Sequence, residues 1–205
     1  MVLSAFIWSR FKVACHNGVN KIPFELFHAA NIRGRVGAPD EQSYYFGNMV
    51  VNAIVKPSLP FKEDEKADQE SSLWWSGIVR QMEESIGNIM SNDGHFIRDI
   101  QKGKEDLKFT REQFEKESKG EIILLGFSNG QNLPVYEADF GWGKPVWVTS
   151  ATLIFNNLVI LIPAGPSNRD IVAYINLSDH HMAKLETDAE FNALVSKVPH
   201  VTSKL

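Results

Sequence analysis

The most chemically distinctive run in this chain is DFGWGKP, residues 139–145. Its two glycines allow the backbone to adopt a positive φ or to approach another segment closely. Its two aromatic side chains favour burial of a large apolar area. A carboxylate buried among them needs a cation or several N–H donors as partners. The run therefore predicts a shaped loop in which a buried Asp139 has a structural role and pairs with a cation or with several N–H donors.

One histidine–aspartate pair has a spacing that could supply a general base. His95 and Asp99 stand four residues apart in the stretch HFIRD, and a histidine in reach of an acceptor hydroxyl can take its proton. The pair also opens a highly charged helical stretch, where this spacing places both side chains on one exposed face. Short patterns of this kind arise readily by chance. We therefore interpret His95 and Asp99 as a surface pair and not as catalytic residues.

The remaining candidates for nucleophilic or metal chemistry are isolated. His180 and His181 are adjacent, so their side chains diverge around a helix and make a poor metal pair. His28 falls in a strand pattern, which is typical of a core or cleft histidine. Cys15 is the only cysteine, which excludes a disulfide within the chain and fits a reducing compartment. The sequence shows no Cys/His cluster with metal-ligand spacing and no nucleophile elbow or phosphate-cradling glycine loop, so we expect no metal site.

The elements that must position these residues are helices and strands in a mixed order. Helical periodicity and stop signals predict helices over Val2–Cys15, Ser71–Ser91, His95–Ser118, Asp179–Glu186 and Asp188–Lys197. Apolar alternation and turn signals predict strands over Phe24–Ile32, Gly47–Val55, Glu121–Phe127, Val146–Phe155, Leu158–Pro163 and Ile171–Leu177. The second of these strands is almost continuously apolar, which predicts burial on both faces. The order of elements predicts an α/β fold with a mixed β-sheet and flanking helices.

The length, composition and charge of the chain argue against several classes of function. The chain has 205 residues, of which 43% are apolar and 22% charged, which fits one globular domain. A net charge of −4 without a basic cluster argues against a nucleic-acid partner. The longest apolar run, Leu158–Pro163, is too short to span a bilayer, and we see no secretory signal. The final tripeptide Ser203-Lys204-Leu205 matches the peroxisomal address, so we expect a peroxisomal location, with the cytoplasm as the alternative.

Several motifs in their order along the chain resemble the plant BAHD acyltransferases, which move an acyl group from coenzyme A to an alcohol or amine. The DFGWG run matches that family's late signature. The other matching stretches are LSAFIW at residues 3–8, ANIRGR at 30–35, YFGN at 45–48, PVYEA at 134–138 and MAKLE at 182–186. The set covers nearly the whole chain. Within the family it is most similar to the vinorine synthase-like branch, which acylates alkaloids, terpenoids and other alcohols.

This resemblance implies one lobe of a chloramphenicol-acetyltransferase-like fold. Residues 1–205 would be the C-terminal lobe. The family's catalytic His-x-x-x-Asp-Gly belongs to the first lobe and is absent here. His95 and Asp99 lie in the wrong half, and Ile100 stands where the motif has glycine.

The resemblance also implies roles for particular residues. Arg35 would pair with Asp139, within a structural motif that includes Phe140, Gly141, Trp142 and Gly143. Ala30, Asn31 and Arg33 would contact coenzyme A, with structural ion pairing as the alternative for the arginine. The implied co-substrate is acyl-CoA, in particular acetyl-CoA, and no resident cofactor is implied. The implied partners are a hydroxylated small-molecule acceptor and the missing N-terminal lobe, and full-length relatives are expected to be monomeric.

Three functional hypotheses follow. The first is an acyl-CoA-dependent O-acyltransferase represented by its second lobe. The second is a non-catalytic truncated relative that binds coenzyme A or a partner lobe. The third is an unrelated small hydrolase, against which the lack of an ordered nucleophile–base pair argues.

Overall fold

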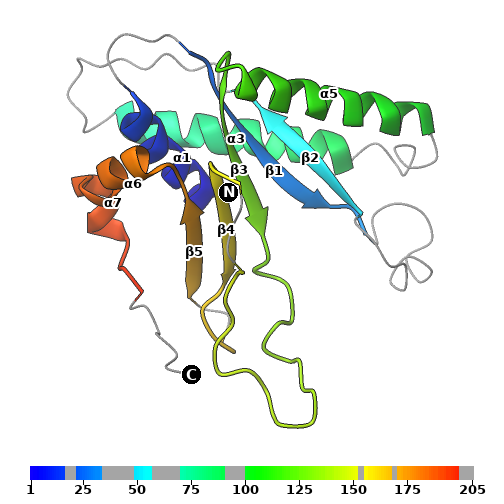
Figure 1. Ribbon diagram of the computed structural model, residues 1–205, viewed down its shortest axis with the longest axis vertical. Coiled ribbons are helices and arrows are strands. Elements are labelled where there is room, and N and C mark those ends of the chain that lie inside the picture. The colour runs from blue at the N-terminus through cyan, green and yellow to red at the C-terminus, as the bar shows by residue number, and fades with distance from the viewer. Residues whose placement is uncertain are drawn as a thin grey trace.

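The fold is taken from a computed structural model. It describes residues 1–16, 22–33, 49–56, 70–90, 100–151, 155–167 and 170–198, without the side chains of 70–75, 89–90, 100–103 and 106. Within these ranges the helices pack around one β-sheet, and a long irregular segment extends beyond the ends of the strands (Figure 1).

The sheet has five strands in the order β2-β1-β3-β4-β5. Their bounds are Phe24–Asn31 for β1, Val50–Val55 for β2, Ile123–Asn129 for β3, Leu158–Pro163 for β4 and Ile171–Asn176 for β5. The three central strands β1, β3 and β4 are parallel, and the two outer strands run antiparallel to their neighbours. The predicted α/β class with a mixed sheet is confirmed.

Five helices are described: α1 (Val2–Cys15), α3 (Glu70–Met90), α5 (Ile100–Ser118), α6 (Asp179–Glu186) and α7 (Ala189–Leu194). Among the described residues, no helix combines the length and the apolar character needed to cross a membrane. Helices α1 and α3 lie on the same face of the sheet, and α6 and α7 pack against α1 (Figure 1).

The main core lies between α1, α3 and one face of the sheet. Trp8 and Phe11 of α1 are both 1% exposed, and they belong to one cluster with Leu26, Leu125 and Phe127 from the central strands. Leu26 and Leu125 are register partners in neighbouring strands, so their side chains lie on the same face. Trp8 is therefore a core residue of this chain.

Helix α5 packs on the opposite face. The ring of Phe27 in β1 meets the ring of Phe114 edge to face, with 5.5 Å between centroids. Gly126 is the β3 partner of Phe27, and a Cβ there would lie 2.3 Å from Cζ of Phe27. The glycine therefore makes room for the aromatic ring under α5.

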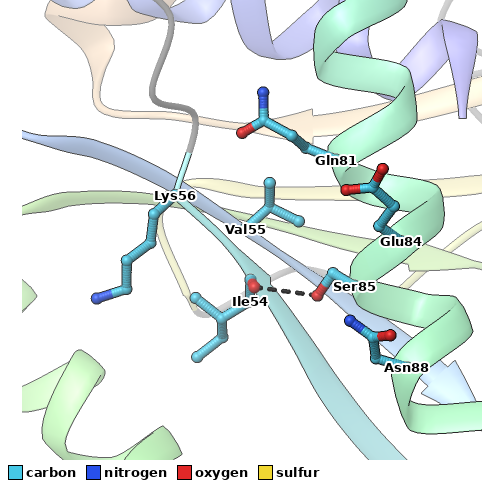
Figure 2. Close-up of a pocket in the computed structure, with 7 residues that line it drawn as sticks. All are labelled: Ile54, Val55, Lys56, Gln81, Glu84, Ser85 and Asn88. Carbon is cyan, nitrogen blue, oxygen red and sulfur yellow. Dashed lines mark hydrogen bonds between the residues drawn. The ribbon is translucent and has the colours of Figure 1, made fainter.

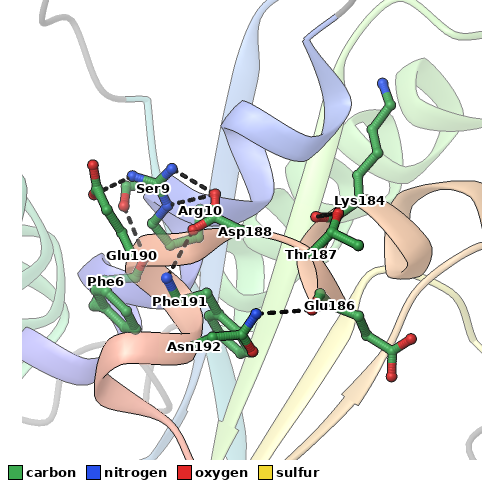
Figure 3. A network of polar contacts seen from close by, with 10 residues as sticks. All are labelled: Phe6, Ser9, Arg10, Lys184, Glu186, Thr187, Asp188, Glu190, Phe191 and Asn192. Atoms are coloured by element: carbon green, nitrogen blue, oxygen red, sulfur yellow. Dashed lines mark hydrogen bonds and ion pairs between the residues drawn. The ribbon is translucent and has the colours of Figure 1, made fainter.

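An ion-pair network joins α1 to α7, as Figure 3 shows. The guanidinium of Arg10 contacts Asp188 at 2.6 Å and also pairs with Glu190. Asp188 is the N-cap of α7, and its Oδ1 accepts a hydrogen bond from the backbone N–H of Phe191 at 2.7 Å. One carboxylate thus satisfies both the arginine and an orphan N–H of the helix.

Three sequence predictions need correction. Residues 146–151 are irregular and Phe155 lies in a bend, so the predicted strand Val146–Phe155 is wrong in the part that is described. β2 is an edge strand whose Val50 is exposed, so it is not buried on both faces. β3 runs from Ile123 to Asn129, so it begins and ends two residues later than the predicted strand Glu121–Phe127.

Candidate functional site

The candidate site is the edge of the sheet at which the parallel strands end. β1, β3 and β4 finish at Asn31, Asn129 and Pro163. Because these strands are parallel, their carboxyl ends share one edge. Ligands of open α/β sheets bind outside this edge. The sequence-predicted residues Asn31 and Arg33 lie there, and the long irregular segment leaves β3 at the same edge (Figure 1).

Neighbouring strands end in the same type of turn. Oδ1 of Asn31 accepts a hydrogen bond from the backbone N–H of Arg33 at 2.9 Å. Oδ1 of Asn129 accepts one from the N–H of Gln131 at 3.0 Å. Such Asx turns fix how the chain leaves each strand. Ala30 is buried within β1, whereas Asn31 is exposed.

The irregular segment between β3 and β4 is referred to below as the arm, residues 130–157, of which 152–154 lie outside the described part. Its first end is held by the N–H of Gly130, which donates to the carbonyl of Leu161 at 2.8 Å. At its other end, the carbonyl of Asn157 accepts from Gly126 at 2.8 Å, and its side chain donates to Glu117 at 3.1 Å. Burial raises the pKa of Glu117, while the hydrogen bond from Asn157 partly opposes that shift. Both ends of the arm are therefore anchored to the folded body.

Asp139 organises the tip of the arm through hydrogen bonds from the backbone. Its Oδ1 accepts from the N–H of Gly141 at 2.8 Å and from the N–H of Gly143 at 3.1 Å. The φ angles of these glycines are 102° and 103°, a region that other residues rarely adopt. Asp139 itself is exposed. The expectation of a buried carboxylate is wrong for this structure, since N–H donors within the arm satisfy it at the surface.

The aromatic residues of the same run are also exposed. Phe140 is 75% and Trp142 84% exposed, and their ring centroids are 5.8 Å apart. Trp142 is therefore not a core residue within the described part of this chain.

Two tyrosines clamp the middle of the arm. The hydroxyl of Tyr136 accepts from the N–H of Val148 at 3.3 Å, and the hydroxyl of Tyr174 in β5 is 3.5 Å from the carbonyl of Val148 and donates to it. Tyr136 is 6% exposed. Neither tyrosine is among the residues that the sequence predicts to be functional. Tyr136 lies in the stretch PVYEA, which precedes the glycine-rich run, and that position is the only signal that could have indicated it.

Several predicted residues lie outside the described part of the chain. These are Arg35, the pair His95 and Asp99, and the tripeptide at 203–205. The pairing of Arg35 with Asp139 and the dismissal of His95 therefore stay predictions. Arg33 is half-buried.

The described body holds two buried groups with reactive chemistry, His28 and Cys15. His28 is 4% exposed, stacks on Phe127 with 5.0 Å between ring centroids, and its Nε2 has no hydrogen-bond partner. Burial, and then the positive amino group of Met1, lowers the pKa of His28 to about 4. Burial raises the pKa of Cys15 to about 12, although Lys184 acts in the other direction. A substrate at the strand edge would not reach either buried group, and the raised pKa keeps the thiol protonated.

Figure 2 shows a shallow groove between β2 and α3. Its volume is about 270 Å³, and it is lined by Ile54, Val55, Lys56, Gln81, Glu84, Ser85 and Asn88. Ser85 donates to the carbonyl of Ile54 at 3.1 Å, which satisfies an edge carbonyl of the sheet. Since β2 is antiparallel to β1, this end of β2 lies opposite the start of β1 and away from the carboxyl edge. The groove therefore is separate from the candidate site.

Among the described residues, no group of three or more His, Cys, Asp or Glu side chains could hold a metal ion. His180 and His181 lie side by side with 5.6 Å between ring centroids. Burial, and then the charges of His180 and Lys184, lowers the pKa of His181. The polar groups of the candidate edge are amides, a guanidinium and backbone N–H groups, which suit an anionic or hydrogen-bonding ligand.

Comparisons with known proteins agree on one family. Residues 1–192 match the Transferase family. Stemmadenine O-acetyltransferase of Catharanthus roseus is 29% identical over 189 residues, which are 91% of this chain and 39% of the relative. Limonoid 1-O-acetyltransferase of Citrus sinensis is 30% identical over 162 residues, 78% of this chain and 33% of the relative.

Solved structures share the fold. Vinorine synthase superposes with a TM-score of 0.67 at 24% identity, over 95% of this chain and 41% of that structure. TRI101 of F. sporotrichioides, in complex with coenzyme A and T-2, superposes with a TM-score of 0.52 at 20% identity, over 93% of this chain and 43% of that structure. The chain thus spans between a third and about two fifths of the length of these proteins.

Proposed function

The chain belongs to the Transferase family, the family of the BAHD acyltransferases, and from this we propose that it forms the second lobe of an acyl-CoA-dependent O-acyltransferase. The observation that carries the proposal is the match over residues 1–192 to a family whose similar members are named as O-acetyltransferases. The proposed acceptor is a hydroxyl group of a specialised plant metabolite, such as an alkaloid, a terpenoid or another alcohol. The proposed donor is acetyl-CoA or a similar acyl-CoA.

The proposed reaction needs a base and a positioned thioester, but no nucleophilic enzyme residue. A histidine takes the proton of the acceptor hydroxyl, the oxygen attacks the thioester carbonyl, and the thiolate of coenzyme A leaves. The described residues offer no histidine at the strand edge in such a position. In the proposed enzyme the first lobe supplies this base, and the second lobe helps to hold the coenzyme.

The carboxyl edge of β1 supports a coenzyme-binding role. The Asx turn of Asn31 fixes the backbone at Arg33, and a guanidinium can bind phosphate through two parallel hydrogen bonds. We propose that Asn31 and Arg33 contact the phosphate or pantetheine part of acyl-CoA. The side chain of Ala30 is buried, so we propose that this residue contacts the coenzyme only through its backbone.

Coenzyme binding and acyl transfer test the proposal separately. We expect Arg33→Gln in the complete protein to weaken coenzyme A binding, measured by calorimetry, by about tenfold, because one charge-assisted contact is lost. The matched control is Arg111→Gln, since Arg111 lies exposed on α5 and pairs within its own helix with Glu115. Unchanged binding in Arg33→Gln would remove this residue from the proposed site.

Activity distinguishes the two leading hypotheses. We expect the present 205 residues to show no transfer from acetyl-CoA to alcohols, and the protein with a preceding lobe to show it. Turnover by this chain that disappears in His95→Ala would overturn our interpretation of that histidine. The alternative is a non-catalytic module that binds coenzyme A or a partner lobe. It predicts binding without turnover even when every coding segment is included.

We further propose a peroxisomal location, on the basis of the tripeptide Ser203-Lys204-Leu205. The receptor reads this signal at a free C-terminus. A fluorescent protein fused in front of the chain should therefore enter peroxisomes. Deleting the tripeptide should leave the fusion in the cytoplasm, and an unchanged distribution would reject the proposal.

A further inference from the structure

Strand β2 combines an edge position with a sequence that favours the addition of another strand. It lies at one edge of the sheet, and among the described residues no strand pairs with its outer side. Its six residues, VVNAIV, include no charge, no proline and no glycine, which is typical of segments that pair with copies of themselves. Val50 is 49% exposed. The unpaired backbone groups of such an edge can bind a further strand.

Helix α3 places a hydroxyl group on this strand. Ile78 and Met82 are buried and fix α3 on the core, and Ser85 follows on the same side of the helix, because residues three and four apart share a face. The hydroxyl of Ser85 donates to the carbonyl of Ile54 in β2 at 3.1 Å, as Figure 2 shows. This carbonyl therefore has a partner within the chain and no longer needs one from an incoming strand.

A lysine at the end of β2 adds a second obstacle to strand addition. The ammonium group of Lys56 pairs with Glu25 of β1 at 3.1 Å and donates to Gln113 of α5 at 3.4 Å. In Figure 2 its side chain points away from Ser85. Lysines and inward-pointing charges are devices that keep edge strands from pairing. The side chain of Glu25 is 6% exposed, so a strand that displaced Lys56 would leave a buried carboxylate without its cation, which is costly.

We propose that Ser85 and Lys56 form an edge guard, which keeps β2 from pairing with β2 of a second copy of this chain. A second copy is the expected partner because a twofold axis brings two identical strands together in antiparallel orientation. The groove beside the edge is lined by both Lys56 and Glu84, so repulsion between like charges does not exclude such a contact. The inference is independent of the proposed function.

The test compares Ser85→Ala with the unchanged 205-residue chain by sedimentation velocity over a range of concentrations. Alanine removes the hydroxyl and is a better helix former than serine, so α3 should keep its fold. We expect the dissociation constant for self-association to fall by about tenfold, because the carbonyl of Ile54 in each copy becomes free to accept from the other copy. The matched control is Ser118→Ala. The hydroxyl of Ser118 donates to the carbonyl of Glu115 in its own helix at 2.8 Å, so its loss should leave self-association unchanged.

A second substitution shows whether β2 is the contact. Val50→Lys adds a charge at an exposed position of the strand, and charges on an edge disfavour pairing. The double variant Ser85→Ala/Val50→Lys should therefore self-associate no more than the unchanged chain. Ser85→Thr keeps a hydroxyl and should also behave like the unchanged chain. In Ser85→Ala, the amides of residues 50–55 should exchange hydrogen more slowly at high protein concentration than at low concentration.

Several outcomes would overturn the inference. Unchanged self-association in Ser85→Ala, or an equal increase in Ser118→Ala, would remove the special role of the Ser85 hydroxyl. An increase that persists in the double variant, or that leaves the exchange of residues 50–55 unaltered, would place the contact elsewhere on the chain. Thermal denaturation of each variant accompanies the comparison. Loss of the fold in Ser85→Ala would show that the hydroxyl holds α3 on the sheet and does not act as a guard.

Discussion

On the helical face of the sheet, Trp8 and Phe11 are buried, whereas Trp142 and Phe140 in the arm are exposed. Both pairs are large aromatics separated by two or three positions. The first pair belongs to one core cluster with residues of α3 and of strands β1 to β4, whereas neither residue of the second pair is in that cluster. The helical face therefore buries its aromatic side chains, while those of the arm stay exposed among the described residues. The stability of the chain should accordingly depend on the first pair and hardly on the second.

The largest expected effect on stability comes from replacing the buried Trp8, in comparison with the exposed Trp142. Trp8→Ala should lower the free energy of unfolding by about 3–5 kcal/mol, because it opens a cavity in the core. Trp142→Ala should change it by less than about 0.5 kcal/mol, as is usual for surface positions. Urea denaturation of both variants of this chain measures the difference. A loss above about 2 kcal/mol in Trp142→Ala would show that the arm is packed within the chain.

The second largest loss of stability should come from removing the ion pair that joins α1 to α7. Asp188→Ala should cost about 3 kcal/mol, since it leaves the partly buried Arg10 unpaired and removes the N-cap of α7. The control is Glu190→Ala, which removes the other partner of Arg10. The side chain of Glu190 is 66% exposed, so its loss should cost at most about 1 kcal/mol. Equal losses in the two variants would contradict this difference, and thermal denaturation measures both.

Through the buried His28 on the helical face, the free energy of unfolding should also depend on pH. His28 binds protons in the unfolded chain near pH 6.5, but in the folded chain only near pH 4. Stability is therefore complete above pH 6.5, falls as the pH drops through the window between these values, and has lost about 2 kcal/mol to this residue at pH 5. His28→Phe should flatten the pH profile of the free energy of unfolding in this window. A part of the slope should remain, because the pKa of His181 is lowered as well. An unchanged slope would show that His28 does not contribute.

The same comparison explains which parts of the fold could be predicted. The bounds of α1, α6 and β4 agree with the sequence prediction to the residue, because their apolar periodicity and stop signals are satisfied by contacts inside the chain. Val146–Phe155 carries an equally good strand signal. It fails because strand composition does not show whether a pairing partner is present. The edge position of β2 was missed for a related reason, since an apolar run does not specify its neighbours.

The candidate site was predictable only in part. The motifs placed Asn31 and Arg33 at a strand end, and the structure puts them at the carboxyl edge beside the arm. The contacts of Tyr136 and Tyr174 with Val148 were missed, because the two tyrosines are 38 positions apart and bond to its backbone N–H and its carbonyl, respectively. No local pattern encodes such a contact.

The smallest expected effect concerns Asp139. The family resemblance implied a buried ion pair with Arg35, and removing one partner of such a pair costs about 3–5 kcal/mol. In the structure the carboxylate is exposed, and its hydrogen bonds come from Gly141 and Gly143 of the same loop. Asp139→Ala should therefore change the free energy of unfolding of this chain by only about 0.5 kcal/mol, while hydrogen exchange at residues 140–143 becomes faster. Asp139→Asn keeps an acceptor oxygen for both N–H groups and should retain the slow exchange. A loss of several kcal/mol in Asp139→Ala would show that the carboxylate has a charged partner in the folded chain, and Arg35→Gln should then cause the same loss.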